Sequence, residues 1–259
     1  RRFDLVYLRH PDLYATQGLA SAPGMTRPAT HRASMGANRP RIALFDLDHT
    51  LLSGDSDVLW IDFLIAHGEL DGPSFSRRNA EMDARYKAGT VNAQAFADFF
   101  VGTLAGRSPA QWEPLRQEFL NQQIIPRLPV DALELVNTHQ RAGDLVVLTT
   151  ATNRFITELT AQYLGIEHLI ATEPEVQDGV FTGRTQGQLN MRDGKVIRLN
   201  VWLEGRGLEL AGLESTAYSD SINDLPLLMA VNQAVAVDPD ARLLAEATAR
   251  GWKILSLKR

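Results

Sequence analysis

The sequence predicts an α/β fold, in which a Rossmann-like parallel sheet forms the core and a helical domain is inserted as a cap. Two strand-like runs lead directly into aspartates: Ile42–Phe45 precedes Asp46, and Ser215–Ser219 precedes Asp220. The unbroken apolar run of the first is typical of a strand buried on both faces of a parallel sheet. The next strand-like run, Leu145–Thr149, follows only after a long series of helix-like segments, too long for a simple crossover between neighbouring strands. We therefore expect a helical cap over the carboxyl edge of the sheet.

We expect the chain to divide into a core, a cap and an extension. Residues 41–54 and 143–259 form the α/β core, residues 55–142 form the helical cap, and residues 1–40 are a disordered or non-native extension. The extension is rich in arginine, poor in acids and without an apolar period, as transit peptides are. It equally fits upstream sequence read from a misplaced start, which we favour because Met35 lies shortly before the first strand.

The composition excludes several classes of function. The chain has no cysteine, which rules out disulfides, thiolate metal sites and cysteine nucleophiles, and fits a cytoplasmic protein. Its formal net charge is −5, and no basic stripe with interleaved aromatic residues occurs, so we expect no nucleic-acid partner. No apolar run is long enough to span a bilayer, so we expect no membrane partner.

Helix-like segments fill the predicted cap. An amphipathic run begins near Asp55, ends at Gly68, and is followed by further segments that proline and glycine residues separate. We expect most of their aromatic side chains to form the core of the cap itself. These predicted helices span Phe75–Lys87, Val91–Leu104, Pro109–Ile125 and Val130–Ala142.

Paired acids follow the first strand, in the stretch IALFDLDHTLL from Ile42 to Leu52. The carboxyl edge of an open α/β sheet is where ligands bind. Asp46 and Asp48 would repel each other there and would need a proton or a cation to coexist. A hard divalent cation with oxygen ligands suits the pair, and a carboxylate can also attack phosphorus. The plainer alternative is a strand that ends in a solvated Asx turn.

Hydroxyl side chains end the strand LVVLTTATN, with Thr149, Thr150 and Thr152 before a helix from about Asn153. The amide groups at the start of that helix would point to the same edge of the sheet. A threonine hydroxyl there would donate to a phosphoryl oxygen, although threonine also commonly caps a helix.

Two later segments carry further polar residues. Lys195 lies early in an amphipathic helix, where a lysine is usually solvated. Asp220 and Asp224 flank a second strand-to-helix turn in STAYSDSINDLPLL, together with Asn223. Two acids at such a turn would hold a metal, or they would only cap the helix.

In order and spacing, these motifs resemble the four motifs of the haloacid dehalogenase (HAD) superfamily of phosphotransferases: DxDxT, a strand-end Ser or Thr, a Lys and an acidic pair. The resemblance covers residues 41–259 and implies a HAD core with a C1-type helical cap, as in the phosphoserine-phosphatase-like subfamily IB. The phrases GDSD, TATNRF and YSDSINDLPLL are similar to a bacterial subgroup often assigned as histidinol-phosphatases. The departures are mild, with Asn190 at an expected cysteine and His49 at a tolerant position.

The resemblance implies roles for the acids. Asp46 would attack phosphorus and become an aspartyl phosphate, and Asp48 would protonate the leaving alkoxide and then activate water. Mg²⁺ would be held by the carboxylates of Asp46 and Asp220 and by the backbone carbonyl of Asp48. Asp224 would orient the metal-bound waters.

The remaining motif residues would bind the transferred group or the substrate. Thr150, favoured over Thr149 by the alignment of TATNRF, and Lys195 would neutralise charge on the phosphoryl group. Thr50 and Asn223 would contact the phosphate or the rest of the substrate.

The substrate is expected to be a small phosphorylated metabolite. Between Asp55 and Glu134 the cap holds twelve acids against seven bases, which favours a substrate with a cationic distal end. Asp55 and Asp57 would bind the amine of the substrate, unless they serve only to cap a helix and keep the surface soluble. L-Histidinol phosphate fits, and the subgroup resemblance favours it; phosphoserine phosphatase or a broad small-metabolite phosphatase is the alternative.

A receiver-like phospho-acceptor signalling module is the rival from another class. Receivers also place an acceptor aspartate, metal-binding acids, a threonine or serine and a lysine at parallel strand ends. The acid/base Asp48, the inserted cap and the length of the chain argue against it.

Overall fold

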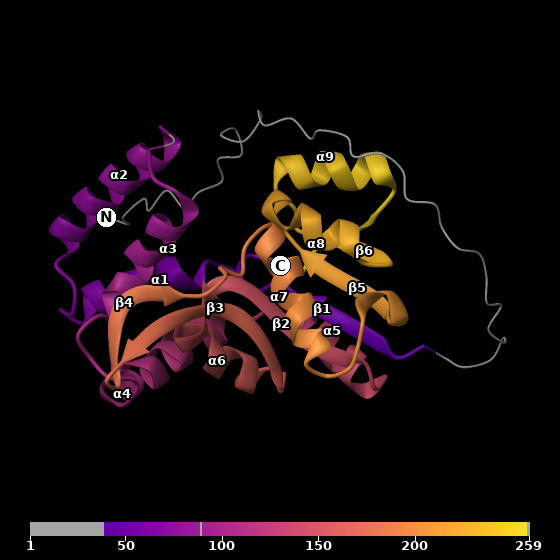
Figure 1. Cartoon of the computed structure of the whole chain (residues 1–259), viewed down its shortest axis with the longest axis horizontal. Coiled ribbons are helices and arrows are strands. Elements are labelled where there is room, and N and C mark those ends of the chain that lie inside the picture. Colours follow the sequence, from indigo (N-terminus) through magenta and orange to yellow (C-terminus); the bar gives the residue numbers. More distant parts are fainter. Residues whose placement is uncertain (1–38, 89, 258–259) are drawn as a thin grey trace.

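The structure, a computed structural model, describes residues 39–88 and 90–257 (Figure 1). The predictions for the N-terminal extension, including a start at Met35, therefore fall almost entirely outside the described residues. Within the described part of the chain, no helix is long and apolar enough to cross a lipid bilayer.

A seven-stranded, mostly parallel sheet forms the core of the described residues, in the order β4-β3-β2-β1-β5-β6-β7. This sheet and the helices around it confirm the predicted α/β class. Within this sheet only β3 and β4 pair antiparallel, and they form a hairpin that turns at Asp178 and Gly179. The strands are β1 (Arg41–Phe45), β2 (Leu145–Asn153), β3 (His168–Gln177), β4 (Val180–Gln186), β5 (Glu214–Ser219), β6 (Gln233–Val237) and β7 (Lys253–Leu255).

The central strand β1 is buried on both faces, as its apolar run predicts. Ala43 and Phe45 join one core cluster, whereas Ile42 and Leu44 join another, because successive side chains of a strand point to opposite faces. The first cluster includes residues of helices α5 (Val130–Arg141) and α6 (Arg154–Tyr163). The second includes residues of α7 (Asp193–Glu204), α8 (Leu225–Ala230) and α9 (Ala241–Arg250).

The register of the sheet brings three strand ends together. Phe45, the last residue of β1, pairs with Leu148 of β2 and with Tyr218 of β5. The polar residues that follow these partners therefore meet at one edge of the sheet, around Asp46. This is the edge at which the sequence predicts the site.

The segment between β1 and β2 is helical, and its helices differ slightly in extent from those expected. Asn92 caps α3 through its side chain, so this helix begins later than predicted. The segment predicted as one helix to Ile125 changes into a π-helical turn after Phe119. The helices are α1 (Ser56–Ala66), α2 (Gly72–Lys87), α3 (Ala93–Val101) and α4 (Pro109–Phe119).

Helix α5 contacts the core sheet, although the expected boundary assigns it to the cap. His139 on α5 packs edge-on against Phe45 of β1 and lies 2.8 Å from the hydroxyl of Tyr218 on β5. The division into 41–54, 55–142 and 143–259 remains a prediction.

Candidate active site

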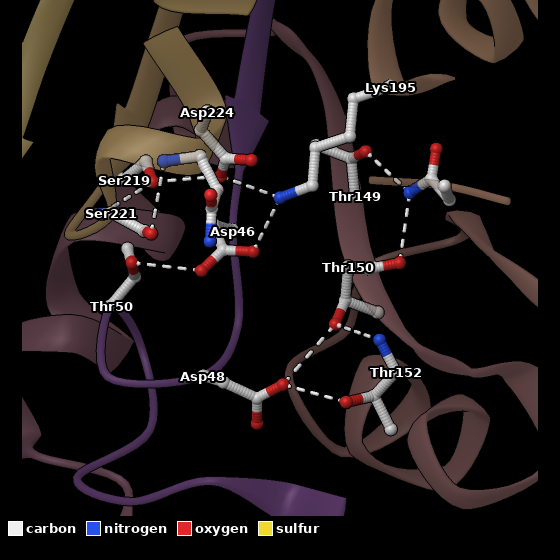
Figure 2. Close-up of polar contacts among 12 residues, drawn as sticks. Asp46, Asp48, Thr50, Thr149, Thr150, Thr152, Lys195, Ser219, Ser221 and Asp224 are labelled. Atoms are coloured by element: carbon white, nitrogen blue, oxygen red, sulfur yellow. Dashed lines mark hydrogen bonds and ion pairs between the residues drawn. The ribbon is translucent and has the colours of Figure 1, made fainter. Parts of the chain in front are cut away.

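Lys195 lies between two carboxylates at the carboxyl edge of the sheet (Figure 2). Its Nζ donates to Oδ1 of Asp46 at 2.7 Å and to Oδ2 of Asp224 at 2.6 Å, and its side chain is 2% exposed. Burial lowers the pKa of Lys195, but Asp224 and Asp46 outweigh this effect and raise it above its ordinary value. The lysine is therefore a fixed buried cation, in contrast to the solvated position usual on a helix.

Thr50 links the acids that follow β1 and β5. Its Oγ1 lies 3.1 Å from Oδ2 of Asp46 and 3.3 Å from Oδ1 of Asp220, and it accepts the N–H of Asp220 at 3.0 Å. The predicted substrate contact at Thr50 is thus a buried hydroxyl that organises two acids, and it does not line the cavity described below.

Burial and neighbouring charges act together on the carboxylate of Asp46. Burial raises the pKa of Asp46 to about 7; Lys195 opposes this rise, while Asp224 and Asp48 add to it. Lys195 is shared between two of these carboxylates, those of Asp46 and Asp224. A further cation at this edge would favour their ionised forms.

The donor set fits Mg²⁺ but is not a complete protein cage. Among residues 39–88 and 90–257, no three or more His, Cys, Asp or Glu side chains are grouped to hold a metal. Mg²⁺ is usually bound through one or two carboxylates, with water and substrate phosphate completing its shell. The convergence of Asp46 and Asp220 on Thr50 supplies such a pair. Asp224, in contrast, uses Oδ2 to accept from both Lys195 and Ser219.

Asp48 points away from this cluster, towards the start of α1 and the end of β2 (Figure 2). Its Oδ1 accepts the N–H of Ser56 at 2.7 Å. Its Oδ2 accepts the hydroxyl of Thr152 at 2.8 Å, and the hydroxyl of Thr150 lies farther away, at 3.5 Å. Both oxygens of the predicted acid/base are therefore held by the protein.

The adjacent threonines of β2 face different neighbours. The hydroxyl of Thr149 accepts from Nδ2 of Asn190 at 3.0 Å, whereas that of Thr150 is directed towards Asp48. Asn190, the residue at the expected cysteine, is fully buried and also donates to the carbonyls of Thr150 and Ile170. It thereby joins strands β2 and β3 to the loop before α7.

A cavity of about 200 Å³ opens beside these residues, between the core and α3 of the cap. Phe96 and Phe100 of α3 form an apolar part of its wall, and Lys195 and Arg192 also line it. The acids that line it are Asp46, Asp48, Asp55, Asp57, Asp220 and Asp224. The structure thus brings the predicted acids to one acidic cavity, which Asn223 also lines.

The predicted substrate-reading acids, Asp55 and Asp57, are each 7% exposed. Asp55 caps α1 by accepting the N–H of Val58 at 3.0 Å. Its burial, together with the charges of Asp48 and Asp57, raises the pKa of Asp55 well above its usual range. Helix capping and exposure to the cavity therefore coexist at Asp55, and a cation bound nearby would favour its ionised form.

Thr152 and Arg192 are polar lining residues to which the sequence-based hypothesis assigns no role. The sequence pattern already places Thr152 among the hydroxyl residues at a strand end, so its presence near the site could be predicted. No sequence pattern points to Arg192. Its backbone adopts φ 52° and ψ −128°, a conformation that favours glycine. The turn is closed by a hydrogen bond from the N–H of Gly194 to the carbonyl of Met191.

Comparison with known proteins shows the family of the chain. The haloacid dehalogenase-like hydrolase family matches residues 43–229. A histidinol-phosphatase of Neisseria meningitidis is 39% identical, over 84% of this chain and 99% of that protein. Phosphoserine phosphatase SerB1 of Mycobacterium tuberculosis is 32% identical, over 94% of this chain and 80% of that protein.

Solved structures share the fold. A protein of unknown function from Bordetella pertussis has a TM-score of 0.81 and 46% identity, over 85% of this chain and 100% of that one. A phospho-aspartyl intermediate analogue of phosphoserine phosphatase has a TM-score of 0.59 and 18% identity, over 86% and 95% of the two chains. The family resemblance inferred from the motifs is confirmed: the chain belongs to the haloacid dehalogenase-like hydrolase family and is a phosphatase.

Proposed function

We propose that the protein is a Mg²⁺-dependent phosphomonoesterase that hydrolyses L-histidinol phosphate through an aspartyl phosphate on Asp46. The observation that carries the proposal is the buried Asp46 carboxylate, held by Lys195 at 2.7 Å and Thr50 at 3.1 Å on the wall of an acidic cavity. This environment orients a carboxylate for attack and keeps a cation beside the transferred charge.

In the first proposed step, an Asp46 oxygen bonds to phosphorus while the bond from phosphorus to the alkoxide oxygen breaks. Asp48 gives its proton to that oxygen, so the alcohol leaves neutral. In the second step Asp48 takes a proton from water, the water oxygen attacks phosphorus, and Asp46 departs as a carboxylate. Lys195 remains charged throughout and, with Thr150, stabilises negative charge on the transferred group.

The metal would be held by Asp46, Asp220 and the backbone carbonyl of Asp48, with Asp224 orienting its waters. Bound there, Mg²⁺ would neutralise phosphate charge and favour the ionised form of Asp46. The pair of carboxylates that converges on Thr50 supports this assignment.

The substrate assignment depends on the acids of the cap. Asp55 and Asp57 line the cavity where they would bind an amine, and L-histidinol phosphate carries an amine and an imidazole but no carboxylate. The 39% identity to a histidinol-phosphatase supports the same choice. The receiver-like alternative is disfavoured by the family match and by the cap helix α3 that walls the cavity.

The test compares kcat/KM for L-histidinol phosphate, L-phosphoserine and a neutral alkyl phosphate on one enzyme preparation with Mg²⁺. We expect L-histidinol phosphate to have the highest value. If phosphoserine is preferred, or if the three values agree within a few-fold, the substrate assignment fails and only a phosphomonoesterase remains.

Phosphoserine is the second candidate because Arg192 lines the cavity and offers a cation for a carboxylate. The identity to SerB1 points the same way. Arg192→Gly suits the backbone of the turn and removes the guanidinium. A selective loss of phosphoserine turnover in this variant would support the second candidate, and unchanged phosphoserine turnover would refute it.

A further inference from the structure

One hydroxyl lies between two carboxylates at the end of β2. Oγ1 of Thr152 is 2.8 Å from Oδ2 of Asp48 and 3.3 Å from Oδ2 of Asp57, and it accepts from the hydroxyl of Ser56 at 3.2 Å. Thr152 is 2% exposed and lines the cavity. Because a hydroxyl carries a single hydrogen, Thr152 can donate fully to Asp48 or to Asp57, but not to both.

We propose that Thr152 is a positioning residue that holds the acid/base Asp48 and couples it to Asp57. Before the cationic end of a substrate contacts Asp57, the carboxylates of Asp48 and Asp57 compete for the Thr152 hydrogen. When the cationic end of a substrate neutralises Asp57, the hydrogen bonds Asp48 alone. The inference rests on the proposed acid/base role of Asp48 and adds a link between substrate binding and proton transfer.

Of the two threonines near Oδ2 of Asp48, Thr152 makes the stronger hydrogen bond. The other oxygen of Asp48 is fixed by the N–H of Ser56 in the first turn of α1, the turn that also contains Asp57. Thr150 is 3.5 Å from the same Oδ2, which makes its hydrogen bond weak. Without the Thr152 hydroxyl, Asp48 would lose a charge-assisted hydrogen bond and would face Asp57 with no shared donor.

Thr152→Val and Thr152→Ser test the positioning, because valine keeps the shape without the hydroxyl and serine restores the hydroxyl. kcat/KM reports the steps up to release of the alcohol, so it is measured with L-histidinol phosphate, propyl phosphate and p-nitrophenyl phosphate. The nitrophenolate leaves without a proton, whereas the alkoxides need one. We expect Thr152→Val to lower kcat/KM about tenfold more for the alkyl esters than for p-nitrophenyl phosphate, and Thr152→Ser to stay within about threefold of wild type.

Thr157→Val is the matched control, because it removes a buried hydroxyl that bonds only the carbonyl of Asn153. We expect it to leave the ratio between alkyl and nitrophenyl substrates unchanged. Melting temperatures of all variants report folding. An equal loss on all substrates in Thr152→Val, or a failure of Thr152→Ser to restore the ratio, would overturn the proposed positioning.

Asp57→Asn tests the coupling. With the competing charge removed, we expect kcat/KM for 2-aminoethyl phosphate to fall at least about fivefold relative to that for propyl phosphate. Equal losses on both substrates would overturn the coupling.

Asp48→Asn separates failure of this inference from failure of the proposed function. If Asp48→Asn discriminates between leaving groups and Thr152→Val does not, only the role of Thr152 is refuted. If Asp48→Asn also fails to discriminate between the leaving groups, both the acid/base role of Asp48 and the positioning role of Thr152 are refuted.

Discussion

Replacing Lys195 with methionine should destabilise the fold strongly, and more so at alkaline than at acidic pH. The substitution keeps much of the apolar stem but removes the ammonium that contacts Asp46 at 2.7 Å and Asp224 at 2.6 Å. Breaking a buried ion pair on one side leaves uncompensated charge and costs about 3–5 kcal/mol. This cost is a large part of the free energy of unfolding of a typical domain, which is about 5–15 kcal/mol.

The dependence on pH follows from Asp46. Its pKa is raised from 3.8 to about 7 in the folded protein, so protonated Asp46 stabilises the fold at low pH and this contribution is lost as pH rises through about 7. Lys195 lowers that pKa, so its removal raises the pKa of Asp46 further. The variant should therefore lose additional stability between neutral and alkaline pH, while at acidic pH Asp46 carries its own proton and the loss is smaller.

The assay is urea unfolding in chelator at pH 5.5 and pH 8, with Lys253→Met as a control at an exposed lysine on β7. The control should change the free energy of unfolding by less than about 0.5 kcal/mol. A loss below about 1 kcal/mol at pH 8 for Lys195→Met, or a loss equal at both pH values, would refute the reasoning that Lys195 compensates buried carboxylates.

Further predictions concern the reaction and the extent of the chain. Asp46→Asn should abolish hydrolysis, and excess chelator should abolish it in the wild type; full activity in either case would contradict the mechanism. Asp48→Asn should fold normally, as judged by its melting temperature, but turn over alkyl phosphates at least about a hundredfold more slowly, and near-normal rates would assign the proton to another group. A chain that starts at Met35 should keep the activity and melting temperature of the longer one; a large drop in either would show that the preceding residues stabilise the core.

The parallel sheet and the meeting of the strand-end acids could be predicted from the sequence. Ile42–Phe45 is apolar at every position, which is typical of a strand covered on both faces of a parallel sheet. Since parallel strands end at a common edge, Asp46 and Asp220 were expected to converge, and the structure brings both within 3.3 Å of the Thr50 hydroxyl.

Roles set by long-range packing could not be predicted in this way. Lys195 contacts Asp46 across 149 positions of sequence, and its local pattern is that of an ordinary helix surface. Arg192 reaches the cavity through a turn that its sequence does not signal, because glycine is the usual residue in that conformation. Thr152 differs from Thr150 only in what it faces, which depends on the approach of α1 to the end of β2.

The central claim is that phosphate passes through a covalent bond to Asp46, and the most direct measurement is to trap that intermediate. Asp48→Asn, which should be slow to hydrolyse the aspartyl phosphate, is mixed with substrate and Mg²⁺, quenched in acid and digested for peptide mass spectrometry. We predict a phosphoryl group on Asp46 in Asp48→Asn and no phosphoryl group in the double variant that carries both Asp46→Asn and Asp48→Asn. A phosphoryl group on any other residue, or turnover of Asp48→Asn under conditions that trap none, would contradict the account.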